Sequence, residues 1–140
     1  IDHFKSFNDI YGHQAGDDVL RAVGKILMDE ARKIDIVARY GGEEFILVAP
    51  ETDLPGALGL AERIREKIEK NNFKVKSKND TLSLKVTVSV GVSTFSETAP
   101  CENDSLIKAA DDSLYHAKHS GRNRVCYNES GDLKQFRRNQ

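Results

Sequence analysis

The sequence predicts an α/β or α+β fold with a mixed β-sheet, because helical and strand patterns alternate along its 140 residues. Apolar residues recur at the spacing of a helix in four stretches, 2–11, 16–31, 53–70 and 102–120. Short apolar runs separate these stretches, and over 82–95 valines alternate with small or polar residues, as in a strand with one buried face. Helices interleaved with hairpins are typical of a mixed sheet flanked by helices.

The first two predicted helices are separated by a glycine. The first, residues 2–11, carries three aromatic rings at helical spacing and stops at Gly12. The second, residues 16–31, has one apolar stripe, as expected for a helix that covers a core. The members of this stripe are Val19, Leu20, Val23, Ile26 and Leu27.

The third and fourth helices have similar one-sided patterns. Asp53 is placed to cap the third helix, with Pro55 in its first turn, and Asn71 ends it. The predicted buried face of the third helix consists of Ala57, Leu58, Ala61, Ile64 and Ile68. The fourth helix, residues 102–120, is predicted to bury Leu106, Ile107, Ala110, Leu114 and Ala117.

A hairpin is predicted around Gly41 and Gly42, which separate the apolar runs 34–40 and 45–49. Paired glycines supply the positive φ angles of a tight turn, and without side chains they let a ligand approach the backbone. The second run has five consecutive apolar residues, which predicts a strand buried on both faces.

The remaining strands are expected in the second half of the sequence. Residues 73–75 and 82–95 are predicted to form strands about a loop at 76–81, and residues 124–127 form a short final strand. Residues 129–140 contain few apolar side chains and are predicted to fray.

Composition limits the functions open to this chain. Its length suits one domain, and its formal net charge of −1 argues against a nucleic-acid-binding protein, which is normally basic. Two cysteines make no disulfide framework, and no apolar run is long enough for a transmembrane helix. We therefore expect a cytoplasmic domain that makes no contact with a membrane.

Two adjacent acids follow the glycine pair of the predicted hairpin. Glu43 and Glu44 could hold a hard divalent cation, Mg²⁺ or Mn²⁺, while the glycines make room for a nucleotide. They could equally be ordinary surface acids on a solvated turn, since short motifs often match by chance. The residues of the hairpin alone leave both interpretations open.

Five sequence motifs in a fixed order favour the first interpretation. They are IDHFKSFND at 1–9, YGHQAGD at 11–17, GGEEF at 41–45, VTVSVGVS at 86–93 and ADDSLYHAKHSGRN at 110–123. Together they resemble the GGDEF family, in its GGEEF form. The resemblance implies that residues 1–128 are one GGDEF domain with a palm-like fold, a central antiparallel sheet flanked by helices.

Members of this family are typically diguanylate cyclases, so the resemblance implies condensation of two GTP into cyclic di-GMP and pyrophosphate with Mg²⁺ or Mn²⁺. It implies that Glu43 and the backbone carbonyl of Ile1 are metal ligands. Glu44 is then a second ligand, a general base or a spectator. Each domain would bind one GTP, so catalysis would need a homodimer with two domains face to face.

The resemblance also assigns GTP contacts. Asn8 and Asp17 match a guanine-reading pair, and a carboxylate can accept from the N1–H and N2–H₂ groups that guanine presents together. Their structural alternatives are a helix-terminal amide for Asn8 and an N-cap for Asp17. The remaining implied contacts to GTP are Phe4, Lys5, Gly42, Lys118 and Arg122.

A second site is suggested by Arg32 and Asp35, which match an RxxD inhibitory site that binds the product, cyclic di-GMP. Arg63 matches a further contact to the same ligand. The alternative for Arg32 is a basic side chain near a helix C-terminus, where it favours the macrodipole.

The resemblance starts at Ile1, whereas relatives have a central strand and a metal-binding aspartate just before this position. We therefore expect that residues 1–140 are an N-terminally truncated domain of a longer protein, with a sensory domain upstream. A second function class stays open, a catalytically silent domain that binds cyclic di-GMP or serves as a signalling scaffold.

Overall fold

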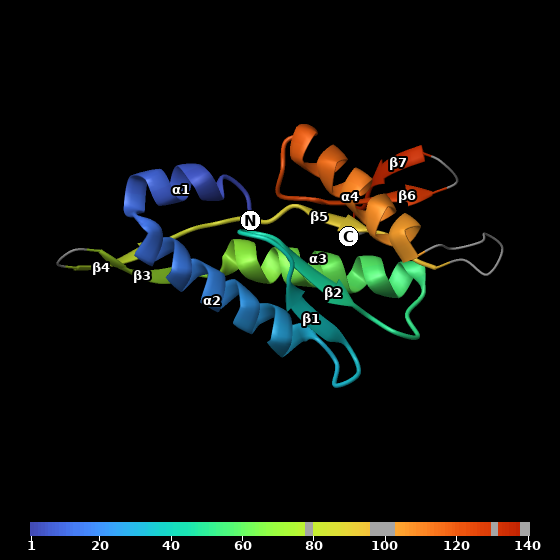
Figure 1. Cartoon of the computed structure of the whole chain (residues 1–140), viewed down its shortest axis with the longest axis horizontal. Helices are drawn as coiled ribbons and strands as arrows, with labels where there is room; N and C mark the ends of the chain where they lie inside the picture. The colour runs from blue at the N-terminus through green and yellow to red at the C-terminus, as the bar shows by residue number, and fades with distance from the viewer. Residues whose placement is uncertain (78–79, 96–102, 130–131, 138–140) are drawn as a thin grey trace. The chain divides into compact units, whose positions relative to one another are not determined.

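The computed structural model describes residues 1–77, 80–95, 103–129 and 132–137. The chain forms two compact units, one made of Ile1–Pro50 and Glu66–Thr87, the other of Glu51–Arg65 and Val88–Gln140. The elements, in chain order, are α1 (Phe4–Tyr11), α2 (His13–Glu30), β1 (Ile36–Arg39), β2 (Phe45–Val48), α3 (Leu54–Lys70), β3 (Phe73–Ser77), β4 (Asp80–Leu84), β5 (Val90–Val92), α4 (Asn103–His119), β6 (Val125–Glu129) and β7 (Asp132–Gln135) (Figure 1).

In the first unit, α2 packs against α1, β1 and β3. Gly12 joins the two helices with a φ of 87°, which side chains rarely tolerate, and its N–H donates to the carbonyl of Asn8. Helix α2 therefore begins at His13, three residues before the predicted start. The buried apolar residues of this unit include Phe4, Phe7, Val19, Val23, Leu27, Ile68, Phe73 and Val75.

Strands β1 and β2 form the predicted antiparallel hairpin, with Ile36 opposite Val48 and Arg39 opposite Phe45. The expectation of positive φ at Gly41 and Gly42 is wrong, since neither has a left-handed backbone. The reason is that residues 40–44 form a loop longer than a two-residue turn. This loop is closed by the N–H groups of residues 40 and 41, which both donate to the carbonyl of Glu44.

The prediction that the second hairpin strand is buried on both faces is also wrong. Residues 45–47 are half-buried, and Val48 keeps 47% of its surface exposed. In the described part of the chain, β1 and β2 pair only with each other, so both strands are edge strands and not the central strand that burial on both faces would suit.

Strands β3 and β4 pair antiparallel from Phe73 opposite Leu84 to Ser77 opposite Asp80. The single strand predicted over 82–95 is interrupted, because residues 85–89 belong to no strand ladder. At Thr87 the carbonyl instead accepts from the N–H of Asp2, and the hydroxyl donates to the Asp2 carboxylate at 2.8 Å. The predicted alternation holds through the interruption, since Val86, Val88 and Val92 are buried.

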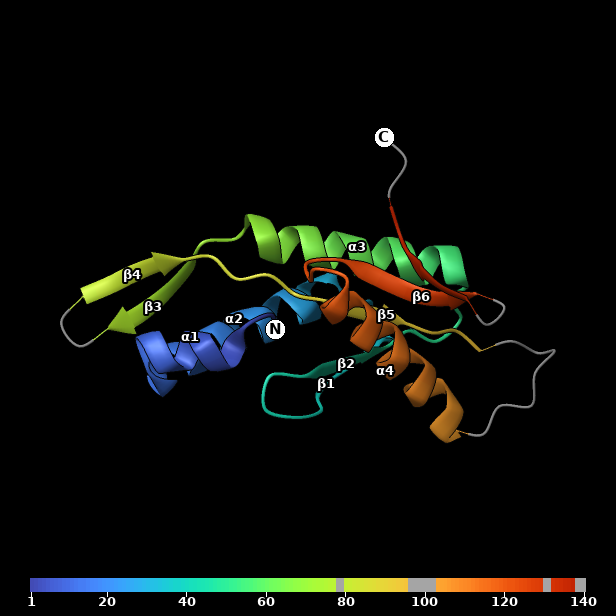
Figure 2. The same ribbon diagram turned by 90° about the horizontal axis from the view of Figure 1, so that it is seen from above.

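In the second unit, β5 pairs parallel with β6, β6 pairs antiparallel with β7, and α4 packs on all three strands (Figure 2). An added Cβ at Gly91 would lie 2.1 Å from the Ala110 carbonyl oxygen, so only glycine lets α4 lie this close to β5. Ser113 and Ala117 are fully buried. The prediction that Ile107 faces the core is wrong, because 42% of it is exposed.

The described part of residues 129–140 differs from the frayed tail that the sequence predicts. Within their described part, residues 132–135 form β7, whose partner strand is β6. Phe136 then donates its N–H to the carbonyl of Val125 and packs against the apolar cluster of Leu58, Ala61, Val92 and Val125. The Phe136 side chain thus anchors this otherwise polar segment to the apolar cluster.

The structure confirms the mixed α+β fold. Its described strands form three small sheets, β1–β2, β3–β4 and β5–β6–β7. The predicted cap of the third helix is also confirmed, because the Asp53 carboxylate accepts from the N–H of Gly56 at 2.9 Å. Among the described helices, none has the length and apolar composition needed to span a bilayer.

Candidate functional site

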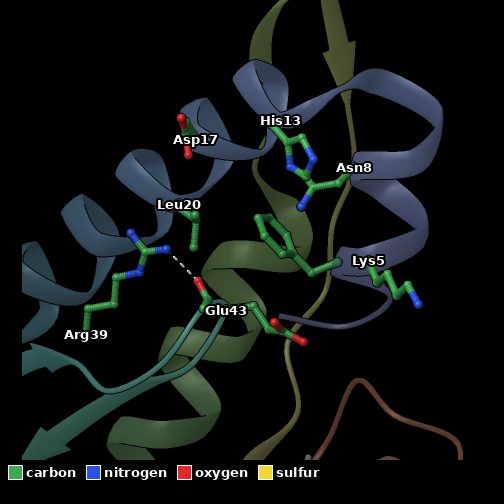
Figure 3. A pocket seen from close by; sticks show the side chains of 9 residues that line it. Lys5, Asn8, His13, Asp17, Leu20, Arg39 and Glu43 are labelled. Carbon is green, nitrogen blue, oxygen red and sulfur yellow. Dashed lines mark hydrogen bonds between the residues drawn. The ribbon is translucent and has the colours of Figure 1, made fainter.

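A pocket of about 450 Å³ lies in the first unit, between helices α1 and α2 and the loop of the β1–β2 hairpin (Figure 3). It brings together six of the residues predicted to bind substrate or metal, which are Phe4, Lys5, Asn8, Asp17, Gly42 and Glu43. The lining is completed by His13, Leu20 and Arg39. Residues far apart in the sequence thus meet in one cavity with both acidic and basic groups.

Asn8 lies inside α1 with its amide in the pocket wall. Its Oδ1 atom is buried and has no hydrogen-bond partner in the described part of the chain. Buried polar atoms are nearly always paired in folded proteins, so this orientation of the amide leaves one hydrogen-bonding group unsatisfied. The amide also lies directly on Gly16, where an added Cβ would be 1.9 Å from Oδ1.

Asp17 lies in the second turn of α2, which begins at His13. The N-cap alternative for Asp17 is therefore wrong, because Gly12 occupies the N-cap position. The exposed Asp17 carboxylate lines the pocket one turn of α2 from His13. Because Asp17 does not cap α2, its carboxylate is not held against the backbone at the start of that helix.

The hairpin loop carries the two acids in different directions. Glu43 lines the pocket. Glu44 turns its carboxylate toward Gly41, where Oε2 would lie 3.2 Å from an added Cβ. A Cβ added to Gly42 would meet nothing within 4 Å, so the space beside this backbone is open to a ligand.

Arg39 holds this loop in shape. Its Nε donates to the carbonyl of Gly41 at 3.2 Å, and its terminal nitrogen donates to that of Gly42 at 2.7 Å (Figure 3). The guanidinium also places positive charge in the pocket wall. Sequence reasoning missed Arg39, and the signal available was a basic residue just before the glycine pair.

Among the predicted metal ligands, Glu43 lines the pocket. In the described residues, no three His, Cys, Asp or Glu side chains are grouped to hold a metal ion. Mg²⁺ in nucleotide sites usually takes one or two carboxylates and completes its shell with phosphate oxygens and water. Glu43 offers one carboxylate, and the main chain of Ile1 lies beside it, with the Ile1 nitrogen 3.1 Å from the Glu43 carbonyl oxygen.

Arg32 and Asp35 form an ion pair after the end of α2. The Arg32 Nε and terminal nitrogen donate to Asp35 Oδ1 at 3.1 and 2.9 Å, and the Arg32 backbone N–H donates to Oδ2 at 2.7 Å. These hydrogen bonds lower the pKa of Asp35, because they stabilise its charged carboxylate. The guanidinium also donates to the Pro50 carbonyl at 2.8 Å, yet half of the Arg32 side chain is exposed.

Three predicted site residues lie in the second unit. Lys118 is in the last turn of α4, Arg122 follows that helix, and Arg63 is an exposed residue of α3. Arg122 has a left-handed backbone with φ of 61°.

The family model described as "Diguanylate cyclase, GGDEF domain" matches residues 1–124. The chain belongs to the GGDEF family. Among curated relatives of this GGDEF domain, diguanylate cyclase A of Treponema denticola is 42% identical over 130 residues, which are 93% of this chain and 34% of the relative. The response regulator PleD of Caulobacter vibrioides is 44% identical over 125 residues, 89% of this chain and 27% of that protein. The chain thus spans about a third or less of these relatives.

Solved structures agree with this assignment. The GGDEF domain of DgcB from Caulobacter crescentus, in complex with c-di-GMP, has a TM-score of 0.80 and 38% identity, covering 89% of this chain and 71% of that one. The active GGEEF domain of a diguanylate cyclase from Vibrio cholerae has a TM-score of 0.77 and 35% identity, covering 93% and 80%. The second structure has the same GGEEF form as residues 41–45 of this domain.

Proposed function

We propose that this GGDEF domain is a diguanylate cyclase, which condenses two GTP into cyclic di-GMP and pyrophosphate. The observation that carries the proposal is the pocket in which Asn8 and Asp17 lie with Lys5, Gly42 and Glu43. Hydrogen-bonding groups for a base, positive charge for phosphates and a carboxylate for a cation are the three things that GTP requires. The named activities of the relatives support the same proposal.

Asn8 and Asp17 read the guanine. The Asp17 carboxylate accepts from N1–H and N2–H₂ together, and adenine has no such pair of donors. The Asn8 amide serves the neighbouring edge of the base from the pocket wall. Phe4 supplies an apolar wall beside the base.

Glu43 and the backbone carbonyl of Ile1 would hold Mg²⁺ or Mn²⁺ with the triphosphate. When bound, such a cation would supply neutralisation of phosphate charge and a lowered pKa for the attacking 3′-hydroxyl. Gly42 lets the phosphates approach the hairpin backbone. Lys5, Lys118 and Arg122 neutralise the remaining charge and orient the α-phosphorus for in-line attack. Glu44 lies beside Gly41 and outside the pocket lining, so this proposal assigns the main ligand role to Glu43.

One domain binds one GTP, so two domains must meet for each new phosphodiester bond to form. We therefore expect a homodimer as the active form, with a rate per domain that rises with protein concentration. A regulatory domain elsewhere in the parent protein would control this meeting.

The test is chromatography of nucleotides after incubation of the concentrated protein with GTP and Mg²⁺, beside a form extended upstream of Ile1. We expect cyclic di-GMP from at least the extended form. If the folded, dimeric protein, cleared of bound cyclic di-GMP, makes none in either form, the cyclase proposal is overturned. The catalytically silent receptor would then be the better explanation.

Asp17→Asn is expected to raise the KM for GTP about tenfold. A charged hydrogen-bond acceptor contributes about 1.5–3 kcal/mol, and the N–H₂ group of the asparagine amide is a donor that would face the donors of guanine. When GTP and ATP compete for the protein, the Asp17→Asn variant should also show a weaker preference for GTP than the wild type. Asp18→Asn is the matched control, since Asp18 pairs with Arg21 and the N–H of Lys76 outside the pocket. Equal effects of both substitutions would contradict the assignment of Asp17.

We further propose that Arg32 and Asp35, with Arg63, bind cyclic di-GMP and mediate product inhibition. The half-exposed Arg32 guanidinium can contact a phosphate of the ligand, whereas the Asp35 side chain is covered in its pair with Arg32 and can meet guanine only when that pair opens. The c-di-GMP complex of DgcB supports this proposal at the level of the family.

Arg32→Ala is expected to leave the initial rate within about twofold of the wild type and to remove the slowing that accompanies product accumulation, because phosphate recognition by a guanidinium fork is lost. Progress curves with added cyclic di-GMP measure both quantities. The neighbouring exposed Lys33→Ala is the control and should be inhibited normally. If cyclic di-GMP inhibits the Arg32→Ala variant as strongly as the wild type, the product must bind at another site.

A further inference from the structure

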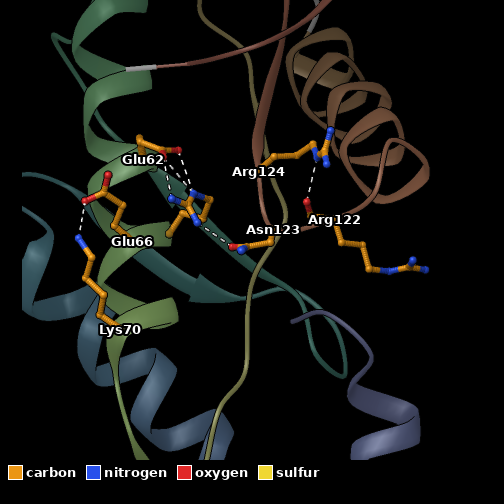
Figure 4. A network of polar contacts seen from close by, with 7 residues as sticks. Glu62, Glu66, Lys70, Arg122, Asn123 and Arg124 are labelled. Carbon is orange, nitrogen blue, oxygen red and sulfur yellow. Dashed lines mark hydrogen bonds and ion pairs between the residues drawn. The ribbon is translucent and has the colours of Figure 1, made fainter. Parts of the chain in front are cut away.

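A buried ion pair on α3 contacts the loop that follows α4, within the second unit of the chain (Figure 4). Arg65 is 9% exposed, and its Nε and one terminal nitrogen donate to the Glu62 carboxylate at 2.8–3.1 Å. Its other terminal nitrogen donates to the side-chain oxygen of Asn123 at 2.7 Å. A buried guanidinium must be paired, and here one partner lies 58 residues away in the sequence.

Asn123 belongs to a loop with three consecutive left-handed residues, Gly121 at φ 109°, Arg122 at φ 61° and Asn123 at φ 48°. Gly121 ends α4 as expected, since the next N–H, that of Arg122, donates to the Ala117 carbonyl at 3.0 Å in a Schellman arrangement. Arginine rarely adopts a left-handed backbone, and such residues persist only where surrounding contacts fix them.

Those contacts hold the loop on both sides of the Arg122 side chain. The Arg122 carbonyl accepts from Arg124 Nε at 2.8 Å, and Arg124 in turn donates to Gln135 of β7 at 3.0 Å. On the other side, Arg65 holds Asn123. The Arg122 guanidinium points away from Glu62 and Asn123 and makes no hydrogen bond or ion pair within the described residues (Figure 4).

We propose that Glu62, Arg65 and Asn123 form a positioning network that fixes the left-handed loop and thereby sets the direction in which the phosphate-binding side chain of Arg122 leaves the backbone. The inference rests on the proposed role of Arg122 as a phosphate contact. Glu62 orients the Arg65 fork, Arg65 fixes Asn123, and Asn123 sets the direction in which Arg122 leaves the backbone. Lysine cannot replace Arg65, because a single ammonium cannot bond Glu62 and Asn123 in this fork geometry.

The test measures the affinity of the purified protein for a non-hydrolysable GTP analogue and for guanosine, by calorimetry and NMR titration. Arg65→Lys is expected to weaken binding of the analogue about fivefold and to leave binding of guanosine unchanged, since only the phosphates are affected. In the Arg122→Ala background, Arg65→Lys should cause no further loss. The matched control is Lys70→Gln, which breaks the exposed Glu66–Lys70 ion pair on the same helix.

Two substitutions at Asn123 separate the hydrogen bond from backbone strain. Asn123→Asp keeps both an acceptor for Arg65 and tolerance of the left-handed region, so it should bind the analogue like the wild type. Asn123→Gly keeps the backbone conformation and loses the acceptor, so it should resemble Arg65→Lys. The positioning role would be overturned if the Gly and Asp variants bound the analogue equally. It would also be overturned if the loss of affinity caused by Arg65→Lys added to the loss caused by Arg122→Ala. If the binding pattern holds while no cyclic di-GMP forms, the cyclase proposal fails and the network stands.

Discussion

Glu43→Gln is expected to lower the rate of cyclic di-GMP formation by at least about 100-fold, with KM for GTP changed by less than about threefold. A bound divalent cation stabilises the transition state of such reactions by several kcal/mol, and each 1.36 kcal/mol is a factor of ten in rate. Glutamine retains the shape of Glu43 and loses the charge that we propose holds the cation. Single-turnover kinetics would measure the rate separately from binding.

Glu44→Gln is the matched control for Glu43→Gln. It removes the same charge one residue along the same loop, yet the Glu44 carboxylate faces Gly41 and does not line the pocket. We expect its rate to fall by less than about tenfold, through the weaker electrostatic effect of a nearby exposed charge. Equal losses in the two variants would show that both acids act on the cation, and an unaffected Glu43 variant would contradict the metal assignment.

Gly16→Ala is expected to lower kcat/KM for GTP by about 10–100-fold and to destabilise the fold. The new methyl would lie 1.9 Å from Asn8 Oδ1 and 3.1 Å from the Phe4 ring, so both side chains must move out of the pocket wall. Overpacking of this kind costs about 1–3 kcal/mol, which outweighs the gain of about 1 kcal/mol from the better helix former. Thermal unfolding and steady-state kinetics would measure the two effects.

Gly24→Ala is its control on the same helix. The added methyl there would lie 3.6 Å from the Phe45 ring, an ordinary contact, so we expect stability to rise by up to about 1 kcal/mol and activity to be retained. A Gly16 variant with normal affinity for GTP would mean that the position of Asn8 is unimportant for reading the base.

The sequence predicted the helices within a few residues, because each is a local pattern of apolar side chains with its own start and stop signals. Asp53 and Gly12, for example, act through bonds to residues three or four positions away. The hairpin was predicted for the same reason. The backbone of its glycines was not, because the length of the loop, and not the residue type, decides whether a positive φ is needed.

The sequence did not predict which side chains from distant parts of the chain contact one another. The C-terminal segment looks polar, yet Phe136 packs against a cluster that the β5–β6 pairing creates. Ile107 has the spacing of a buried residue, yet α4 turns Ser113 and Ala117 inward. On a helix, several neighbouring stripes of residues could each form the buried face. Packing against the sheet decides which of them is buried.

The sequence by itself determined the order of the elements, the family and the residue types of the candidate site, since these follow from periodicity and from ordered motifs. Tertiary structure decided which groups meet: that Glu43 and not Glu44 lines the pocket, that Gly16 makes room for Asn8, and that Arg65 holds Asn123. The physical reason is that local propensity acts over a few residues. Contacts between distant side chains depend on packing, which all the elements determine together.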